Sequence, residues 1–202
     1  MQIDFLRAGL FIAMATGLLG SPGPGISALV SLGRSRGFAR SMPFFWGLQL
    51  GLDVAAAGCA VGLFSLVRTI PGAVTTLAVI GTTYLVWLAY RIATAPVRGS
   101  SGARKNEPAF TAAGGFLLGV TNPKAYLAFV SLMSSQVVVR SNASADVFFK
   151  WLAIAVVIVV VDMVWLWIGA VLGRSDMGPR GERTLNVAMG SVILGSSILA
   201  WV

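Results

Sequence analysis

Residues 17–33 read GLLGSPGPGISALVSLG, which places Pro22 and Pro24 inside what is otherwise a long apolar helix. A proline within a helix removes one backbone donor and clashes with the carbonyl one turn earlier. Lipid cannot satisfy the backbone groups that such a break frees, so a break within a membrane survives only against protein or a water-filled cavity. A simple proline kink, satisfied by neighbouring side chains, is the alternative interpretation of this stretch.

The composition of the chain indicates a membrane protein. Of its 202 residues 56% are hydrophobic and 11% are charged, and the mean hydropathy is +0.84. A water-soluble domain of this size could not hide so much apolar surface. A helix that crosses about 30 Å of hydrocarbon needs roughly 20 residues, so the chain has room for about six spans. We therefore expect an all-α, polytopic membrane protein formed as a single domain over residues 1–202.

The apolar stretches predict six spans, and the connections between them hold nearly all of the charge. The predicted spans are Phe5–Leu32, Met42–Val67, Gly72–Ala93, Phe110–Val138, Phe148–Gly173 and Thr184–Val202. A polar loop at residues 96–109 separates a first half, residues 1–95, from a second half, residues 110–202. Because each half contains an odd number of spans, the second half should enter the membrane in the opposite direction.

The two halves carry matching interruptions. Span 1 is broken by SPGPG at residues 21–25, and span 4, the first of the second half, is broken by TNPKA at residues 121–125. Paired discontinuous helices in oppositely oriented halves are typical of inverted repeats, which form a binding site near the middle of the membrane. We therefore expect two inverted three-helix repeats with a substrate pathway at the two breaks.

Arginine and lysine are distributed unevenly between alternate connections. Ten lie in the connections after spans 1, 3 and 5: Arg34, Arg36, Arg40, Arg91, Arg98, Arg104, Lys105, Arg174, Arg180 and Arg183. Four lie on the opposite side: Arg7, Arg68, Arg140 and Lys150. Cytoplasmic loops carry the excess of basic residues, so both termini are predicted to be periplasmic. The net charge of +8 is thus a topology signal, and no nucleic-acid partner is predicted.

Two acidic residues fall near the middle of equivalent spans, Asp53 in span 2 and Asp162 in span 5. An aspartate at the centre of a membrane helix costs roughly 2.5–3.5 kcal/mol on insertion, which makes a functional role the default interpretation. We expect both carboxyl groups to bind a proton or a cation. A purely structural hydrogen-bonding role is the alternative.

Helical spacing predicts the direction in which these acids point. Small residues recur every three or four positions in span 2: Gly47, Gly51, Ala55, Gly58 and Gly62. Such a stripe lets another backbone approach closely, either within the chain or between two copies in a homodimer. Asp53 lies off this stripe with Gln49 one turn before it, so the two should share a polar face. In span 5 Asp162 lies in line with Trp165, Gly169 and Gly173.

The chain has no histidine and a single cysteine, Cys59. This excludes zinc hydrolases, haem ligation through histidine, and Ser/His or Cys/His nucleophiles. No cofactor, metal site or enzymatic activity is predicted.

Lys124 directly follows Pro123, where broken span 4 restarts, and a restarting helix offers unpaired N–H groups to an anion. We expect Lys124 to belong to the pathway, with snorkelling to an interface as the alternative.

Three stretches together resemble the LysE/RhtB family of bacterial amino acid exporters: SPGPGISALVSLGRSRGFARSMPFFWGLQLG, TTYLVWLAYRIA and FTAAGGFLLGVTNPKAYLAFVSLM. The resemblance implies six helices in two related halves and export of amino acids or their derivatives, driven by the proton gradient across the bacterial inner membrane. The motif positions carried over are Pro22, Gly23, Pro24, Asn122, Pro123 and Lys124. The chain departs from the family at Gly25, where asparagine is usual, and this departure lies in the expected site.

We therefore expect a multi-pass exporter of small amino-acid-like solutes, with protons as the coupled ion and the lipid bilayer as its surroundings. A metal-cation efflux carrier would use the same acids, but two carboxylates without histidine or cysteine are a poor ligand set. An intramembrane aspartyl protease and a non-transporting membrane scaffold are the remaining alternatives. Transport or hydrolysis assays would separate these classes.

Overall fold

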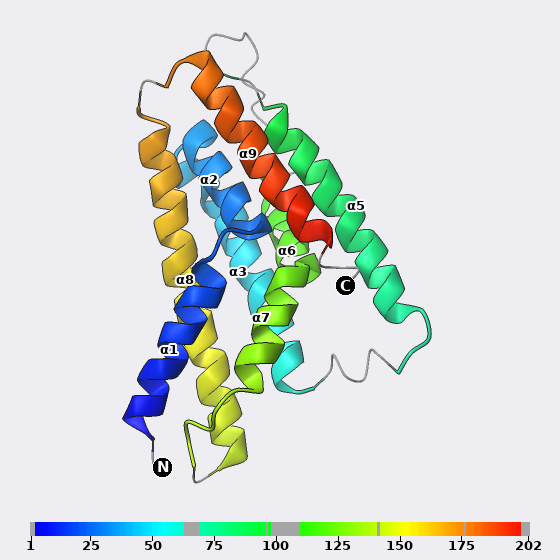
Figure 1. Ribbon diagram of the computed structural model, residues 1–202, viewed down its shortest axis with the longest axis vertical. Helices are drawn as coiled ribbons and strands as arrows, with labels where there is room; N and C mark the ends of the chain where they lie inside the picture. Colours follow the sequence, from blue (N-terminus) through cyan, green and yellow to red (C-terminus); the bar gives the residue numbers. More distant parts are fainter. Residues whose placement is uncertain are drawn as a thin grey trace.

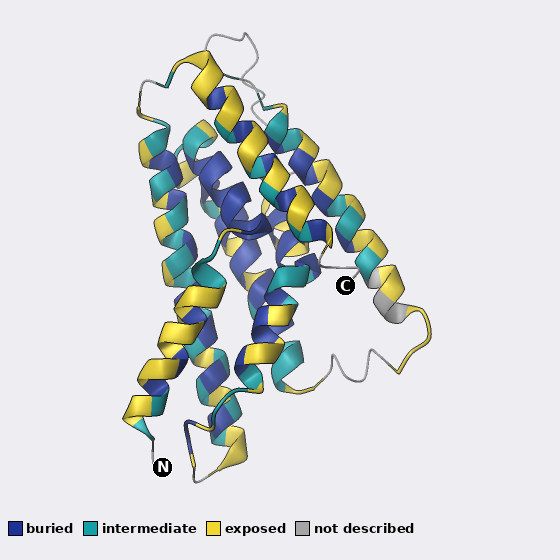
Figure 2. Ribbon diagram, in the orientation of Figure 1, coloured by how far each residue is buried: buried dark blue, intermediate teal, exposed yellow. Residues whose placement is uncertain are grey.

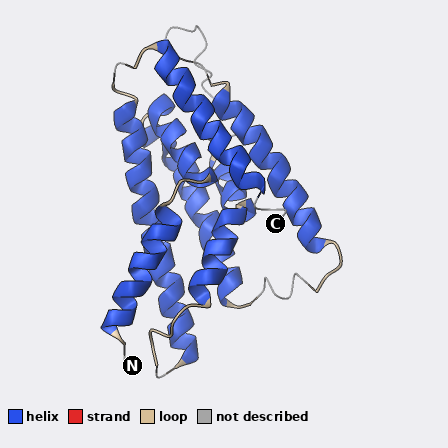
Figure 3. Ribbon diagram, in the orientation of Figure 1, coloured by secondary structure: helices blue, strands red, loops and turns tan. Residues whose placement is uncertain are grey.

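The computed structural model of the chain describes residues 3–62, 69–95, 97, 110–140, 142–175 and 177–198. Within these ranges the chain is all-helical (Figures 1 and 3), and its one β contact is an isolated bridge between Ile3 and Val139. The helices are α1 (Phe5–Gly20), α2 (Pro24–Arg36), α3 (Phe38–Ala60), α5 (Ala73–Ala93), α6 (Ala112–Thr121), α7 (Pro123–Met133), α8 (Ala143–Leu172) and α9 (Pro179–Ile198). The predicted all-α fold class is confirmed.

Both predicted helix breaks are present. Helix α1 ends at Gly20 and α2 begins at Pro24, with a bend of 65° between them. Helix α6 ends at Thr121 and α7 begins at Pro123, with a bend of 56°. In each case a proline occupies the first turn of the second helix. Backbone N–H groups in a first turn have no hydrogen-bond partner within the helix, so a proline there costs no hydrogen bond. The two stretches are thus true interruptions and not simple kinks.

Helix boundaries differ from the prediction at several ends. Helix α8 begins at Ala143 and not at Phe148, because the Asn142 side chain accepts hydrogen bonds from the amides of Ser144 and Ala145 and caps an earlier turn. Helix α3 begins four residues before the predicted Met42, and α9 begins at Pro179 and not at Thr184. The predicted end of span 2, the loop at 96–109 except residue 97, and the last four residues lie outside the described residues.

Length and apolar composition identify fewer membrane spans than the sequence predicted. Among the described residues, α8 is long and apolar enough to cross a membrane, and the α1–α2 and α6–α7 pairs qualify if each bent pair counts as one span. Helix α5 is apolar over the shorter stretch Ala78–Ala93. Helix α9 carries Arg180, Glu182 and Arg183 in its first turns, which lowers its hydropathy. The six-span inverted repeat therefore stays a prediction.

The outer faces of the helices are rich in large apolar side chains, while α2 lies at the centre with residues 24–33 all buried (Figure 2). Exposed examples are Leu6 on α1, Phe148 and Trp167 on α8, and Tyr90 on α5. An apolar surface of this kind suits a hydrocarbon solvent and is unfavourable in water.

Glycines bring backbones into direct contact at two helix pairs. Between α3 and α6 the contacts pair Gly47 with Ala112, Gly51 with Phe116, Gly115 with Phe44 and Gly119 with Leu52. Between α2 and α8 they pair Gly33 with Leu166, Gly169 with Val30 and Gly173 with Arg34. In each pair the atoms that a Cβ would meet are backbone atoms, which cannot rotate away. Gly47 and Gly51 of the predicted stripe thus pack within the chain, and a homodimer stays a prediction.

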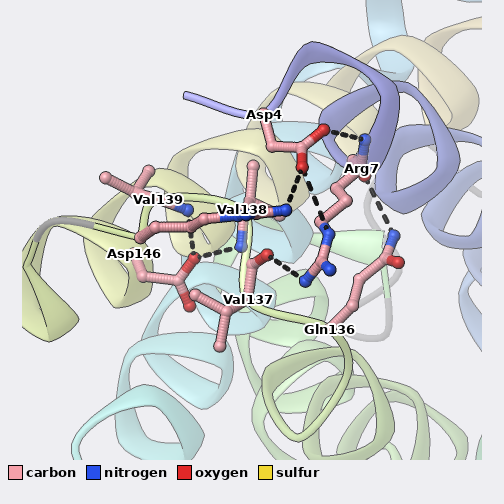
Figure 4. Close-up of polar contacts among 8 residues, drawn as sticks. Asp4, Arg7, Gln136, Val137, Val138, Val139 and Asp146 are labelled. Carbon is pink, nitrogen blue, oxygen red and sulfur yellow. Dashed lines mark hydrogen bonds and ion pairs between the residues drawn. The ribbon is translucent and has the colours of Figure 1, made fainter. Parts of the chain in front are cut away.

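A group of polar contacts ties the start of α1 to the segment between α7 and α8 (Figure 4). The Asp4 amide donates to the Val138 carbonyl at 3.0 Å, and the Asp4 carboxylate accepts from the Arg7 amide. The buried Asp146 carboxylate accepts from the amides of Val138 and Val139 at 2.6 and 2.8 Å. Asp146 therefore has a structural role at this end of the molecule.

The glycine contacts predict a position-specific response to one added methyl group. Gly115→Ala should lower the free energy of unfolding by about 1–3 kcal/mol, because its Cβ would collide with the backbone of α3. Gly9→Ala on α1 is the matched control, since a Cβ there meets nothing within 4 Å. Thermal unfolding in detergent micelles measures both. Equal stability of the two variants would contradict the close packing.

Candidate functional site

A cavity lies where the two helix breaks meet. It is partly open to solvent, and its empty space amounts to about 390 Å³ with that open part included. Most of its lining is aliphatic, with polar groups from both breaks and from α8: Leu18, Leu19, Gly23, Gly25, Ile26, Leu52, Asn122, Lys124, Ala125, Ala128, Ile158 and Asp162. A mainly apolar cavity with a few convergent polar groups is the usual form of a small-molecule site.

Lys124 bridges the two breaks. It is the second residue of α7, and its ammonium group donates to the carbonyls of Ser21 and Pro22 at the end of α1, the second at 3.3 Å. Its aliphatic stem runs over Gly23, where a Cβ would lie 2.7 Å from Lys124 Cδ. The predicted place of Lys124 at the restart of span 4 is correct. Its ammonium group, however, already has carbonyl partners from the first break.

Asp162 is buried on α8 and faces the cavity. Its Oδ2 accepts a hydrogen bond of 2.9 Å from Gln49 Nε2 on α3. Lys124 of α7 lines the same cavity as Asp162. Asp162, Gln49 and Lys124 therefore form one polar cluster contributed by three helices, against an otherwise aliphatic wall.

Asn122 and Gly25 complete the polar side of the cavity. Asn122 sits between α6 and α7, and its backbone carbonyl accepts from the Ala125 amide at 3.1 Å. Its side-chain Oδ1 is buried and has no hydrogen-bond partner among the described residues. A Cβ at Gly25 would make ordinary contact with Leu48, at 3.5 Å, so glycine at this position leaves room that a side chain could fill.

The structure brings together most of the residues predicted for the pathway. Gly23, Gly25, Asn122, Lys124 and Asp162 line the cavity. Gln49 reaches it through Asp162, and Pro22, Pro24 and Pro123 form the breaks beside it.

Asp53 is not among the lining residues. It lies one turn beyond Gln49 on α3, with a buried Oδ1 that has no hydrogen-bond partner in the described part of the chain. Its backbone carbonyl accepts from Trp151 Nε1 at 3.4 Å. Gln49 and Asp53 therefore have different surroundings: the Gln49 amide binds Asp162, and Asp53 does not line the cavity.

Two groups were not predicted as part of a site. Trp165 was placed in line with Asp162, and its indole N–H donates to the Gly20 carbonyl at the first break, at 3.2 Å. The sequence predicts Arg34 only as one of the basic residues on the cytoplasmic side. In the structure its side chain is buried against α9. Its Nη1 lies 3.6 Å from Glu182 Oε1, and its Nη2 lies 2.6 Å from Asn186 Oδ1. The polar residues in the first turns of α9 were the signal for this second cluster.

Across residues 3–62, 69–95, 97, 110–140, 142–175 and 177–198, no group of three potential metal ligands gathers.

The Gln49–Asp162 contact predicts a measurable coupling. In a double-mutant cycle, Gln49→Ala and Asp162→Ala should be non-additive in unfolding free energy by about 1.5–3 kcal/mol, the range for a hydrogen bond to a charged group. Gln49→Ala with Asp4→Ala is the control cycle. It should be additive within about 0.5 kcal/mol, because Asp4 pairs with Arg7 and Arg140 at the start of α1 and shares no partner with Gln49 among the described residues. Denaturation in micelles measures both cycles, and additivity in the first would contradict the contact.

Comparisons with known proteins agree with this architecture. A model of the LysE type translocator family matches residues 16–200. The chain is 34% identical over 123 residues to the cysteine/O-acetylserine efflux proteins of Escherichia coli (strain K12) and Shigella sonnei (strain Ss046), a region covering 61% of this chain and 62% of each relative. The chain thus matches less than two thirds of the length of these curated relatives. No solved structure matches the chain.

The family match extends over nearly the whole chain, from the last turn of α1 to the end of α9. It confirms the family resemblance drawn from the sequence. The chain belongs to the LysE type translocator family.

Proposed function

We propose that this protein exports small amino acids across the bacterial inner membrane by proton antiport, with cysteine and O-acetylserine as the substrate class. The observation that carries the proposal is the cavity at the two helix breaks, which presents one buried carboxyl group and one amino group on an aliphatic wall. The curated relatives are cysteine/O-acetylserine efflux proteins, which supports this substrate class.

A zwitterionic amino acid matches the charges of this cavity. Its carboxylate can pair with Lys124, and its ammonium group can donate hydrogen bonds to Asp162. The aliphatic lining, including Leu52 and Ile158, suits a small side chain. Glycine at position 25 enlarges the space on the α2 side.

Proton coupling follows from the position of Asp162. A carboxylate buried in an apolar wall is stable when it holds a proton or faces a positive charge. Asp162 has one hydrogen-bond donor, Gln49, which is neutral. If the substrate ammonium and a proton bind Asp162 in turn, then outward movement of substrate is tied to inward movement of protons. Rocking of the two predicted repeats about the breaks would expose the cavity to each side in turn.

Transport in everted membrane vesicles tests this proposal. Labelled cysteine should accumulate in the lumen when it is acidified, and an ionophore that collapses the proton gradient should abolish the accumulation. Vesicles that concentrate cysteine equally without a gradient would rule out proton antiport. Vesicles that never take up amino acids would remove the transport proposal itself.

Substitution of the two predicted acidic residues by asparagine tests which of them takes part in proton-driven transport. Asp162→Asn should reduce gradient-driven transport to background with normal amounts of protein in the membrane, since asparagine keeps the volume and the contact with Gln49 but cannot release a proton. Asp53→Asn tests the second predicted acid in the same way. Asp4→Asn is the control, because Asp4 lies in the polar group at the start of α1. Normal transport by Asp162→Asn would make that residue structural.

The charge distribution predicts the orientation of the chain. Reporter fusions at the C-terminus should be active only with a reporter that works in the periplasm. The connections that hold ten basic residues are predicted to face the cytoplasm, and the C-terminus lies on the opposite side. A fusion in the connection at residues 96–109 is the matched control and should give the opposite result. Cytoplasmic activity at the C-terminus would reverse the assigned topology.

A further inference from the structure

The ammonium group of Lys124 occupies a cation site formed by the end of α1. Two consecutive carbonyls, those of Ser21 and Pro22, accept its hydrogen bonds. These carbonyls belong to the break, where a helix leaves its last acceptors without intrahelical donors and carries partial negative charge. The neighbouring Gly20 carbonyl already accepts from Trp165. The first break therefore binds positive charge in this structure, and not the anion that a restarting helix alone would favour.

The contact depends on Gly23. A Cβ at this position would lie 2.7 Å from Lys124 Cδ and 3.2 Å from Nζ, so any other residue would push the lysine away from the carbonyls. Gly23 itself is extended, with φ of −169°, which any residue can adopt. Space for the lysine stem, and not backbone conformation, is the reason for glycine here.

A carboxyl group lies in the same cavity as the lysine. Asp162 lines the cavity and accepts a hydrogen bond from the neutral Gln49 through Oδ2. A buried carboxylate is stabilised by a nearby positive charge, so a second ammonium group is favoured there.

We propose that Lys124 is a built-in competitor for the ammonium group of the substrate. The substrate ammonium binds beside Asp162 and replaces Lys124 on the carbonyls of Ser21 and Pro22, and the released lysine pairs with the substrate carboxylate. This inference deepens the proposed function and rests on it for the class of substrate. No bond is formed or broken in the exchange, since one ammonium group takes the place of another.

The exchange makes the site selective for molecules that carry both charges. A simple amine would displace Lys124 from the two carbonyls and supply no carboxylate to replace that contact. A simple carboxylate has no ammonium group to donate hydrogen bonds to the carbonyls of Ser21 and Pro22 once the lysine leaves them. Only a zwitterion supplies a replacement for each contact. Lys124 is thus a specificity-determining residue that discriminates against amines.

Three related probes separate this exchange from simple carboxylate binding by Lys124. They are L-cysteine, its decarboxylated amine cysteamine, and its deaminated acid 3-mercaptopropionate, each titrated under reducing conditions into the full-length protein in lipid nanodiscs. In Lys124→Met cysteamine should bind about tenfold more tightly than in the wild type, as expected when a competitor that occupies a site nine-tenths of the time is removed. Binding of 3-mercaptopropionate should weaken. Loss of the lysine charge alone would also favour the amine, so Gly23→Ala, which keeps that charge and displaces the lysine stem, separates the exchange from simple repulsion.

Matched variants guard against a general structural effect. Gly23→Ala should tighten cysteamine binding in the same direction, because its Cβ displaces the lysine stem. Gly17→Ala, where a Cβ meets nothing within 4 Å, should match the wild type. Lys124→Arg keeps the positive charge and should keep cysteamine binding weak.

The outcomes separate the exchange from the proposed function. Cysteamine binding that is no tighter in Lys124→Met than in the wild type, or no binding of any probe to either protein, overturns the exchange. Tighter cysteamine binding in both Lys124→Met and Gly23→Ala supports it even if the everted vesicles fail to move cysteine, a result that would reject the export proposal alone. Tighter binding in Lys124→Met without any gain in Gly23→Ala overturns the exchange.

Discussion

Two broken helices leave backbone groups that have no intrahelical partner, and the organisation of this protein follows from how those groups are satisfied. The carbonyls at the end of α1 are met by Lys124 from the second break and by Trp165 from α8. In a lipid solvent such groups must be satisfied by protein or by enclosed water. The breaks are therefore placed against each other, and the cavity forms between them.

Glycine contacts hold this arrangement from both sides. Helix α2 leaves the first break and packs backbone to backbone on α8, the helix that carries Asp162. Helix α6 leads into the second break and packs in the same way on α3, the helix that carries Gln49. Helices α3 and α8 also pack against each other, and there the Gln49 amide lies 2.9 Å from the Asp162 carboxylate.

The acids of the chain illustrate how environment decides role. Asp146 is buried but satisfied by the amides of Val138 and Val139 and by an ion pair with Lys150 at 2.9 Å, so it stabilises a helix start. Asp162 is equally buried and has the neutral Gln49 as its hydrogen-bonding partner, at the wall of a cavity. Burial alone does not separate the two, because the donors around each carboxylate determine whether it is available to a proton or a ligand.

The sequence by itself determined the all-helical class, the two breaks and the family, because proline removes a backbone donor wherever it occurs and because motif order is a property of the chain. It also determined that Gly47 and Gly51 would form a contact face, since that spacing repeats with the helix. Only the tertiary structure decided that Gln49 meets Asp162 and not Asp53, and that Lys124 rests on the carbonyls of the opposite break. Helical periodicity says which residues share a face. It does not say which helix, more than 100 residues away in the chain, that face will meet.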